Sequence, residues 1–252
     1  MKALLRWLVL TLAAVLALQV YFVLRIAVMA RVDPQSTAFQ RSEAWRVLHE
    51  KPALHWRQRW LPYAAISDSL KQAVIVSEDD GFSAHDGVDW DALKKAWQKN
   101  TKAQARAERA PVSVGSGGSA GVGKTRARTP KIVGGSTITQ QLAKNLFLSG
   151  ERTLLRKGQE LVLTLLLETL LSKQRILEIY LNSVEWGEGV FGAEAAAQRY
   201  FGKSASRLGS LESARLAVML PRPKYFEKLP DSGYLAERSA LIANRLGGAA
   251  LP

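Results

Sequence analysis

Cysteine is absent from this sequence of 252 residues, and histidine occurs only three times. The absence of cysteine excludes disulfides and thiolate metal sites, which fits a reducing cytosol and a disulfide-free periplasmic protein equally well. Acidic residues are also scarce: 22 of them stand against 35 lysines and arginines, a formal net charge of +13. Such an excess predicts an anionic partner, which could be nucleic acid, an anionic membrane surface or a phosphate-bearing substrate.

A convincing alternation of apolar and polar residues, the pattern of a half-buried strand, is also missing from the sequence. Apolar residues recur instead at helical spacing, as at Ile176, Leu177, Tyr180 and Leu181. The segment from Leu161 to Leu171 is nearly all apolar but too short to span a membrane, so it is predicted as a buried central helix. We therefore expect one all-α, or nearly all-α, domain.

One long uncharged run lies near the N-terminus. Residues 7–24 form 18 uncharged positions, flanked by Lys2 and Arg6 before them and by Arg25 and Arg31 after them. This length is close to the minimum for a transmembrane helix. The alternative is a cleaved signal peptide, whose apolar core is usually about 7–15 residues. We favour an uncleaved anchor.

The expected organisation is a short cytoplasmic tip and transmembrane anchor over residues 1–31, followed by a folded domain over residues 32–252. A first helix that follows a short basic N-terminus usually leaves the C-terminus outside. A helix is predicted from Asp89 to Asn100, with Asp89 as its cap. A basic, Gly/Ser-rich and mobile loop is then predicted as an insertion at residues 101–131.

This predicted loop has an unusual composition. Residues 101–131 contain five glycines and two prolines, and residues 99–131 carry eight basic residues against one acidic residue. Residues 118–125 match the P-loop pattern literally. A P-loop needs a buried strand before it and a helix after it, and the flanking sequence supports neither. We therefore do not expect nucleotide binding.

The stretch from Gly134 to Glu160 combines two glycines with N-cap residues and many polar side chains. Thr137 and Gln140 have the spacing of a capping box. A glycine turn that leads into a helix N-terminus offers backbone N–H groups and a positive dipole end to an anion. The polar and basic side chains are Ser136, Gln141, Lys144, Asn145, Arg152, Arg156 and Lys157. The alternative is a capped amphipathic helix followed by a charged one, with a surface ion pair between Lys157 and Glu160.

Three successive carboxyl groups, Glu78, Asp79 and Asp80, follow an apolar run that is predicted as a buried helix. They repel one another, and burial would raise at least one pKa. Glu78 is nearest to the apolar residues and is the best candidate for a general base or acid. The alternative is a solvated helix end, and a lone His85 is more often structural than catalytic. Together with Glu160 and the basic stretch, Glu78 suggests glycosyl chemistry on a phosphorylated sugar.

Four segments resemble, in order, the motifs of family 51 peptidoglycan glycosyltransferases. The first is Glu78-Asp-Asp-Gly-Phe82-Ser-Ala-His85-Asp-Gly87-Val-Asp89, and the second runs from Gly134 to Asn145. The third is Arg156-Lys157-x-x-Glu160, and the fourth is Lys173-x-x-Ile-Leu-Glu178-x-Tyr180-Leu-Asn182. The sequence contains no Ser-x-x-Lys and no Lys-Thr-Gly. The resemblance is therefore to the monofunctional, membrane-anchored form, which lacks the penicillin-binding transpeptidase half. The basic segment between the first two motifs is longer than the family pattern leads us to expect.

The resemblance implies a mostly helical, lysozyme-like fold and a processive, inverting transfer that polymerises lipid II. Glu78 would take the proton from the 4-hydroxyl of the acceptor sugar as that oxygen attacks the anomeric carbon of the growing chain. The leaving polyprenyl pyrophosphate would be neutralised by the basic stretch, with Glu160 as the second catalytic carboxylate that orders this site. The implied pyrophosphate-binding residues are Ser136, Gln141, Lys144, Arg152, Arg156 and Lys157. The implied supporting residues are Asp79, Phe82, His85, Gly135, Thr137 and Asn145.

The resemblance implies no required cofactor, and it is compatible with a divalent cation, Mg²⁺ or Mn²⁺, at the pyrophosphate; no metal ligand is assigned. The implied partners are lipid II, the lipid-linked glycan chain, membrane lipids and other cell-wall synthesis proteins, but neither nucleic acid nor a nucleotide. The implied location is the bacterial inner membrane, with the domain on the periplasmic side.

Two alternatives remain open. The first is a muramidase or lytic transglycosylase, which shares the helical fold and a catalytic Glu but needs no pyrophosphate site. The second is a non-catalytic membrane scaffold or nucleic-acid binder that uses the basic loop.

Overall fold

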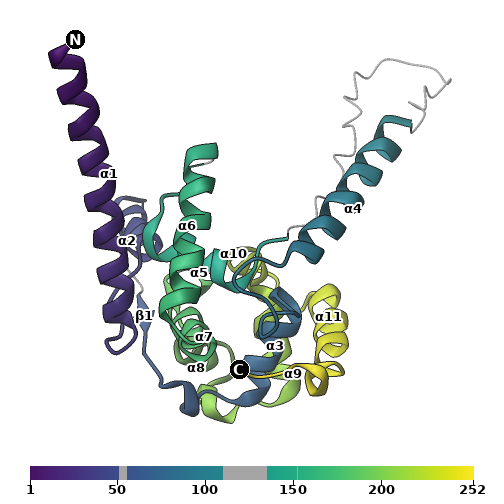
Figure 1. Cartoon of the computed structure of the whole chain (residues 1–252). Coiled ribbons are helices and arrows are strands. Elements are labelled where there is room, and N and C mark those ends of the chain that lie inside the picture. The colour runs from purple at the N-terminus through teal and green to yellow at the C-terminus, as the bar shows by residue number, and fades with distance from the viewer. Residues whose placement is uncertain (51–55, 110–134, 152) are drawn as a thin grey trace. The chain divides into compact units, whose positions relative to one another are not determined.

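The computed structural model describes most of the chain, namely residues 1–50, 56–109, 135–151 and 153–252. Within these ranges the chain is mostly helical, which confirms the predicted fold class (Figure 1). The chain divides into two compact units, one formed by residues 1–88 with 137–252 and the other by residues 89–136.

The larger unit contains most of the elements. Its helices are α1 Lys2–Met29, α2 Ala38–Glu50, α3 Asp68–Glu78, α5 Ile138–Phe147, α6 Leu154–Leu170, α7 Lys173–Ser183, α8 Ala193–Phe201, α9 Ser210–Met219, α10 Pro223–Phe226 and α11 Gly233–Ala243. Its 3₁₀ turns are η1 Tyr63–Ala65, η2 Ala205–Arg207 and η3 Leu246–Gly248. Its strands are β1 Arg57–Gln58, β2 Glu185–Gly187 and β3 Val190–Phe191.

Helix α1 is, within the described ranges, the single helix long and apolar enough to cross a membrane. Its 28 residues extend over about 42 Å at ~1.5 Å per residue, which exceeds the ~30 Å hydrocarbon core of a bilayer. The surplus lies at the C-terminal end, where Phe22, Ile26 and Met29 are buried against the rest of the unit. Helix α1 is therefore continuous with the folded domain.

Specific contacts join the end of α1 to α5, α6 and α7. The ring of Phe22 meets Phe147 edge-on, with ring centroids 5.3 Å apart. The amides of Gln19 and Gln159 exchange hydrogen bonds of 3.2 and 3.3 Å. Arg175 Nε donates to the carbonyl oxygen of the last residue of α1 at 2.8 Å, where a cation also favours the negative end of the helix dipole.

The core of the larger unit follows from the apolar spacing of its helices. Helix α9 packs against α3 and α11, and α5 packs against α2, α6 and α7. Fully buried pairs four residues apart mark one inward face on each helix. Examples are Leu70 with Val74, Ile138 with Leu142, and Leu163 with Leu167. Each such side chain contributes about 1.5–3 kcal/mol through burial, and the packing of α3 against α9 and α11 holds the helix that leads into the first motif.

The three short strands form one small sheet in the order β1-β3-β2. Strand β1 pairs parallel to β3, and β2 pairs antiparallel to β3 with a register irregularity between Glu185 and Gly187. The glycine after β3, Gly192, has φ +84°, and a Cβ there would lie 2.7 Å from the carbonyl oxygen of Asn182. Strands of two or three residues are too short to show an alternating pattern, so the sequence did not reveal them.

Helix α6 corrects one prediction. The segment from Leu161 to Leu171 was expected to be buried, but Leu161, Val162 and Leu165 are 38%, 43% and 48% exposed. The helix buries one face, through Leu163 and residues at helical spacing from it, and leaves the opposite face uncovered. Apolar composition alone therefore did not indicate burial on all sides.

The smaller unit contains α4, Trp90–Arg109. Asp89 caps this helix as predicted, because its Oδ1 accepts from the backbone N–H of Ala92 at 2.7 Å. The helix continues past Asn100, so residues 101–109, predicted as part of a loop, are helical. Lys, Ala, Gln and Arg in this stretch are strong helix formers even without an apolar stripe. The rest of the predicted loop, residues 110–131, lies outside the described residues.

Candidate active site

Glu78 is the last residue of α3. Ser67 begins the helix by accepting from the backbone N–H of Leu70 at 3.3 Å, and the apolar face of the helix holds its C-terminal end against α9. The half-buried Glu78 carboxylate accepts from Gln141 Nε2 at 3.0 Å and from Ser77 Oγ at 3.5 Å. Burial raises the pKa of Glu78 and the charge of Asp79 adds to the rise, whereas the two hydrogen bonds lower it. The result is a carboxylate that takes up a proton more readily than an exposed one.

Asp79 connects the first motif to the second. It is buried, and its Oδ2 accepts from the backbone N–H of Ile138, the first residue of α5, at 2.9 Å. Its Oδ1 lies 2.8 Å from His85 Nε2. Because Gly87 N–H donates to His85 Nδ1 at 3.2 Å, the proton of this imidazole belongs on Nε2 and points to Asp79.

Two backbone N–H groups in the first turn of α5 are already engaged by side chains of the same chain. Asp79 accepts from the first N–H, and Thr137 Oγ1 accepts from the Gln140 N–H at 3.2 Å in the predicted capping box. The anion site expected at this N-terminus exists, but the anion is Asp79. Part of this N-terminus is therefore engaged within the chain, and binding of a substrate phosphate there stays a prediction.

Thr137 also ties the second motif to Gly87 of the first. Its hydroxyl donates to the Gly87 carbonyl oxygen at 2.6 Å. Gly87 has φ +86°, and a Cβ there would lie 2.7 Å from Thr164 Cγ2 of α6. Only glycine combines that backbone conformation with such a close approach.

Gln141 faces Glu78 and a residue of the fourth motif, Tyr180. Its Nε2 donates to Glu78, and its Oε1 accepts from the hydroxyl of Tyr180 at 3.0 Å. Tyr180 is completely buried. Gln141 was predicted to bind pyrophosphate; in the structure one end of its amide engages the candidate base and the other end engages Tyr180, and the predicted role stays a prediction.

Glu160 is buried on α6 between two cations. Arg156 Nη1 lies 2.8 Å from Glu160 Oε2, and Lys157 Nζ contacts Glu160 Oε1. These are the i,i+4 and i,i+3 pairs that the sequence indicated. The Glu160 side chain is only 6% exposed, whereas that of Lys157 is 53% exposed. Arg156 Nε is buried without a hydrogen-bond partner among the described residues.

Lys144 brings a third cation toward Glu160. Burial lowers the pKa of Lys144, Glu160 raises it, and Arg156 and Lys157 lower it, which places the four charges within electrostatic reach. No salt bridge involves Lys144 within the part of the chain that the structure describes. The residue as a whole is exposed, and the burial that lowers its pKa comes from the protein atoms around its ammonium group. Lys144 is three residues after Gln141, one helical turn along α5. One face of α5 therefore leads from the Glu78 carboxylate to a net positive cluster.

The remaining predicted residues separate into three groups. Phe82 is fully buried, with Lys173 Nζ 4.6 Å from its ring centroid, and Asn145 is partly exposed on α5. Gly135 and Ser136 belong to the smaller unit, where Gly135 packs against α4. Arg152 lies outside the described residues. The roles assigned to all these residues stay predictions.

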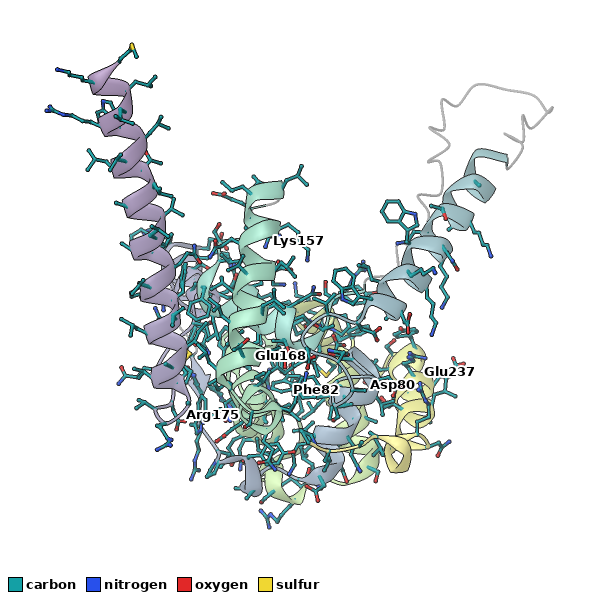
Figure 2. All side chains as sticks on the ribbon, viewed as in Figure 1. Asp80, Phe82, Lys157, Glu168, Arg175 and Glu237 are labelled. Carbon is teal, nitrogen blue, oxygen red and sulfur yellow. The ribbon has the colours of Figure 1, made fainter. Side chains whose placement is uncertain are left out.

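The predicted set did not include three residues of the site, namely Glu168, Lys173 and Tyr180. Lys173 Nζ donates to the carbonyl oxygen of His85 at 2.6 Å and to Glu168 Oε1 at 2.9 Å. Glu168 also accepts from the hydroxyl of Thr139. Figure 2 shows Glu168 and Phe82 near each other, with Lys157 at the far end of α6 from Glu168. Lys173 and Tyr180 stand in the fourth motif, seven residues apart, and that spacing was the signal available for them.

The acidic residues do not fit a resident divalent cation. Within the described ranges, no group of three or more His, Asp or Glu side chains is arranged to hold a metal ion. Both oxygens of Glu160 already face cations, and both oxygens of Asp79 already accept hydrogen bonds. The oxygens of these two buried carboxylates are therefore engaged within the protein, and the divalent cation at the pyrophosphate stays a prediction.

The chain is similar to one protein family over most of its length. A family model described as Transglycosylase matches residues 46–120 and 112–247. A protein named biosynthetic peptidoglycan transglycosylase from Burkholderia thailandensis is 53% identical over 237 residues, covering 94% of this chain and 83% of the relative. Proteins with the same name from Burkholderia multivorans and Janthinobacterium sp. (strain Marseille) are 50% and 48% identical, covering 95% and 100% of this chain and 88% and 99% of the relatives.

Proposed function

This chain belongs to the transglycosylase family, and we propose that it polymerises the glycan strands of peptidoglycan from lipid II. One observation carries the proposal. Helix α5 connects a half-buried carboxylate with a raised pKa, Glu78, to a net positive cluster around Glu160. A base and an anion-stabilising group are the two parts that transfer from a pyrophosphate donor requires, and α5 meets them through Gln141 and Lys144, one helical turn apart.

Glu78 acts as the general base. The acceptor is the 4-hydroxyl of lipid II, and its oxygen forms the new bond to the anomeric carbon of the lipid-linked chain. Glu78 takes the hydroxyl proton while the bond between that carbon and the pyrophosphate oxygen breaks, with its electron pair leaving on the pyrophosphate. Attack opposite the leaving group inverts the anomeric configuration.

Lys144, Arg156 and Lys157 stabilise the negative charge that develops on the leaving pyrophosphate. Arg156 and Lys157 are held by Glu160, whose buried carboxylate orients both side chains. The buried Nε–H group of Arg156 has no hydrogen-bond partner among the described residues. A phosphate oxygen of the substrate would accept this hydrogen bond. The other members of the predicted set are Ser136, Gln141 and Arg152. A pyrophosphate is a good leaving group, so charge stabilisation suffices without a strong acid.

The apolar helix α1 supports a reaction at a membrane. We propose that α1 crosses the bacterial inner membrane and that the domain lies on the periplasmic side, because the basic residues Lys2 and Arg6 precede the uncharged run of the helix. The packing of α1 on α5 and α6 supports a domain held close to the membrane surface, where the lipid-linked substrates are found. Membrane lipids and other cell-wall synthesis proteins are the further partners proposed.

A polymerisation assay tests the function. The full-length protein in detergent is incubated with labelled lipid II, and in a separate reaction with polymerised glycan. We expect lipid II to be converted to long glycan chains and polymerised glycan to remain intact. Shortening of the polymer without growth from lipid II would identify a lytic enzyme instead. The cation cluster argues against that alternative, since cleavage of glycan releases no pyrophosphate.

A further inference from the structure

Three side chains from three different helices are joined in series by hydrogen bonds, and the series ends on the candidate base. The hydroxyl of Tyr180 on α7 donates to Gln141 Oε1 on α5 at 3.0 Å. Gln141 Nε2 donates to Glu78 Oε2 on α3, also at 3.0 Å. Tyr180 is fully buried, so its hydroxyl reaches Glu78 only through the amide of Gln141.

The direction of this series depends on which way the Gln141 amide points. An ionised carboxylate only accepts hydrogen bonds, so it needs the amide Nε2. A protonated carboxyl group can donate, and it would be served equally well by the amide Oε1 after the amide turns over. Without a further constraint, the amide would follow the protonation state of Glu78 and stabilise both states.

Tyr180 supplies that constraint. If the amide turned over, Nε2 would face the phenol oxygen, which can accept, but the phenol proton would lose its acceptor. Among the described residues, the Tyr180 hydroxyl donates to Gln141 Oε1, and an unpaired buried donor is unfavourable. The buried phenol therefore opposes amide reversal and keeps Nε2 directed at Glu78.

We propose that Tyr180 is a positioning residue that holds the Gln141 amide in the one orientation that serves an ionised, acceptor-only Glu78. The role rests on the proposed function, because it concerns the residue that acts as the base. Tyr180 itself does not touch the reacting atoms. Its effect passes through Gln141 alone.

The other charges around Glu78 leave this interpretation intact. Asp79, next in the chain, is compensated by the N-terminus of α5 and by His85. Asp80 forms an ion pair of 2.8 Å with Arg245, next to η3. Burial raises the pKa of Tyr180 well above its ordinary value, and the nearby Glu78 and Asp79 raise it further. The phenol therefore stays protonated throughout an ordinary assay range.

Within the part of the chain that the structure describes, no charged side chain of the helices packed against α3 forms an ion pair or hydrogen bond with Glu78. On α9, Glu212 pairs with Lys203 and Arg215 donates to the carbonyl oxygen of Pro230. On α11, Glu237 and Arg238 are exposed. Replacing the Tyr180 hydroxyl therefore changes the Glu78 environment mainly through the amide.

The test is the pH dependence of Tyr180→Phe in the full-length protein. Phenylalanine frees the amide to serve a protonated Glu78, so the pKa of Glu78 rises. The free energy of one hydrogen bond is large enough to raise the acidic midpoint of the pH dependence of kcat by about 0.5–1 pH unit. Activity should fall about three- to tenfold on the acidic side of the midpoint, recover toward the wild-type rate at high pH, and show little change in KM for lipid II.

Tyr200→Phe is the matched control. It removes a hydroxyl that donates to the carbonyl oxygen of Trp186 at 2.7 Å, and its acidic midpoint should equal that of the wild type. In a Gln141→Leu background, Tyr180→Phe should give no further shift, because the intermediary is gone. An unchanged midpoint for Tyr180→Phe, the same shift in both backgrounds, or an equal loss of rate at every pH would overturn the proposal.

Two measurements keep the test decisive. If Tyr180→Phe does not fold, 3-fluorotyrosine at position 180 makes a stronger donor, and the midpoint must move downward instead. An NMR titration of isotope-labelled glutamate, with Glu78 assigned through Glu78→Gln, reports the same shift without any substrate. Failure of the wild type to polymerise lipid II would therefore reject the proposed function, whereas an unmoved Glu78 titration would reject the role of Tyr180.

Discussion

Glu78 and Glu160 carry the same side chain in opposite surroundings. Glu78, at the end of α3, accepts from an amide and a hydroxyl, both neutral, and its pKa is raised by burial. Glu160, on α6, is buried between the guanidinium of Arg156 and the ammonium of Lys157. The first arrangement favours uptake of a proton, and the second compensates a fixed negative charge.

The difference shows how one residue type can serve two roles within one site. Neutral donors orient Glu78 without neutralising it, so that it can act as a base. Glu160 and its two cations form a cluster that remains positive overall. The role of Glu160 is therefore to hold Arg156 and Lys157 in position. Helix α5 relates the two environments, with Gln141 at one and Lys144 at the other.

The largest expected effect comes from removing the base. Glu78→Gln preserves size but cannot accept a proton, so polymerisation of labelled lipid II should fall about 10³-fold, within the usual range for a general base. The matched control is Glu237→Gln, because Glu237 is an exposed side chain on α11 (Figure 2). Activity above a tenth of the wild-type value would show that Glu78 is not the base.

Glu160→Gln should affect stability as well as rate. Removing the carboxylate leaves the positive charges of Arg156 and Lys157 next to each other without a compensating negative charge. Because one of the two cations is half exposed, we expect the free energy of unfolding to fall by about 3 kcal/mol. The Tm should drop by about 10 °C, and activity should fall about 10²-fold because the cations lose their positions.

The control for Glu160 is Glu212→Gln. Glu212 and Lys203 form a partly exposed pair, 2.7 Å apart, and exposed pairs contribute about 0–1 kcal/mol. Its Tm and rate should stay near the wild-type values. If the two variants lost stability equally, burial between cations would not distinguish Glu160.

The pH dependence separates the two carboxylates further. Because the folded pKa of Glu78 is raised, the active, deprotonated base is lost as pH falls through a midpoint above the ~4.3 of an exposed Glu. Activity should fall about tenfold for each pH unit below that midpoint and reach a plateau above it. Stopped-time assays across pH test this directly, and a midpoint at or below the ordinary value would contradict the burial of Glu78.

The smallest effect is expected from the basic segment between the first two motifs. Deleting residues 110–130, which leaves α4 and Gly135 in place, should change the rate of lipid II polymerisation less than about threefold, since no residue of either carboxylate environment is removed. Complete loss of activity, with an unchanged Tm, would instead make this segment part of the catalytic machinery.

Local features of the fold were predictable because they depend on nearby residues. The Thr137–Gln140 capping box and the Asp89 cap occur where the sequence placed them, since each needs only a spacing of three residues. The end of α4 was not predictable in the same way. A polar sequence without an apolar stripe indicates neither helix nor loop, and propensity carried the helix on through residues 101–109.

The sequence by itself determined the residue types of the site, the apolar anchor and the helical character of the domain, because these follow from composition and periodicity. Only the tertiary structure decided which groups meet. It filled the N-terminus of α5 with Asp79, directed Gln141 toward Glu78, and placed the hydroxyl of Tyr180 behind that amide. These pairings join segments distant in sequence, and their geometry depends on how the buried faces of α3, α5 and α7 pack, which local patterns do not specify.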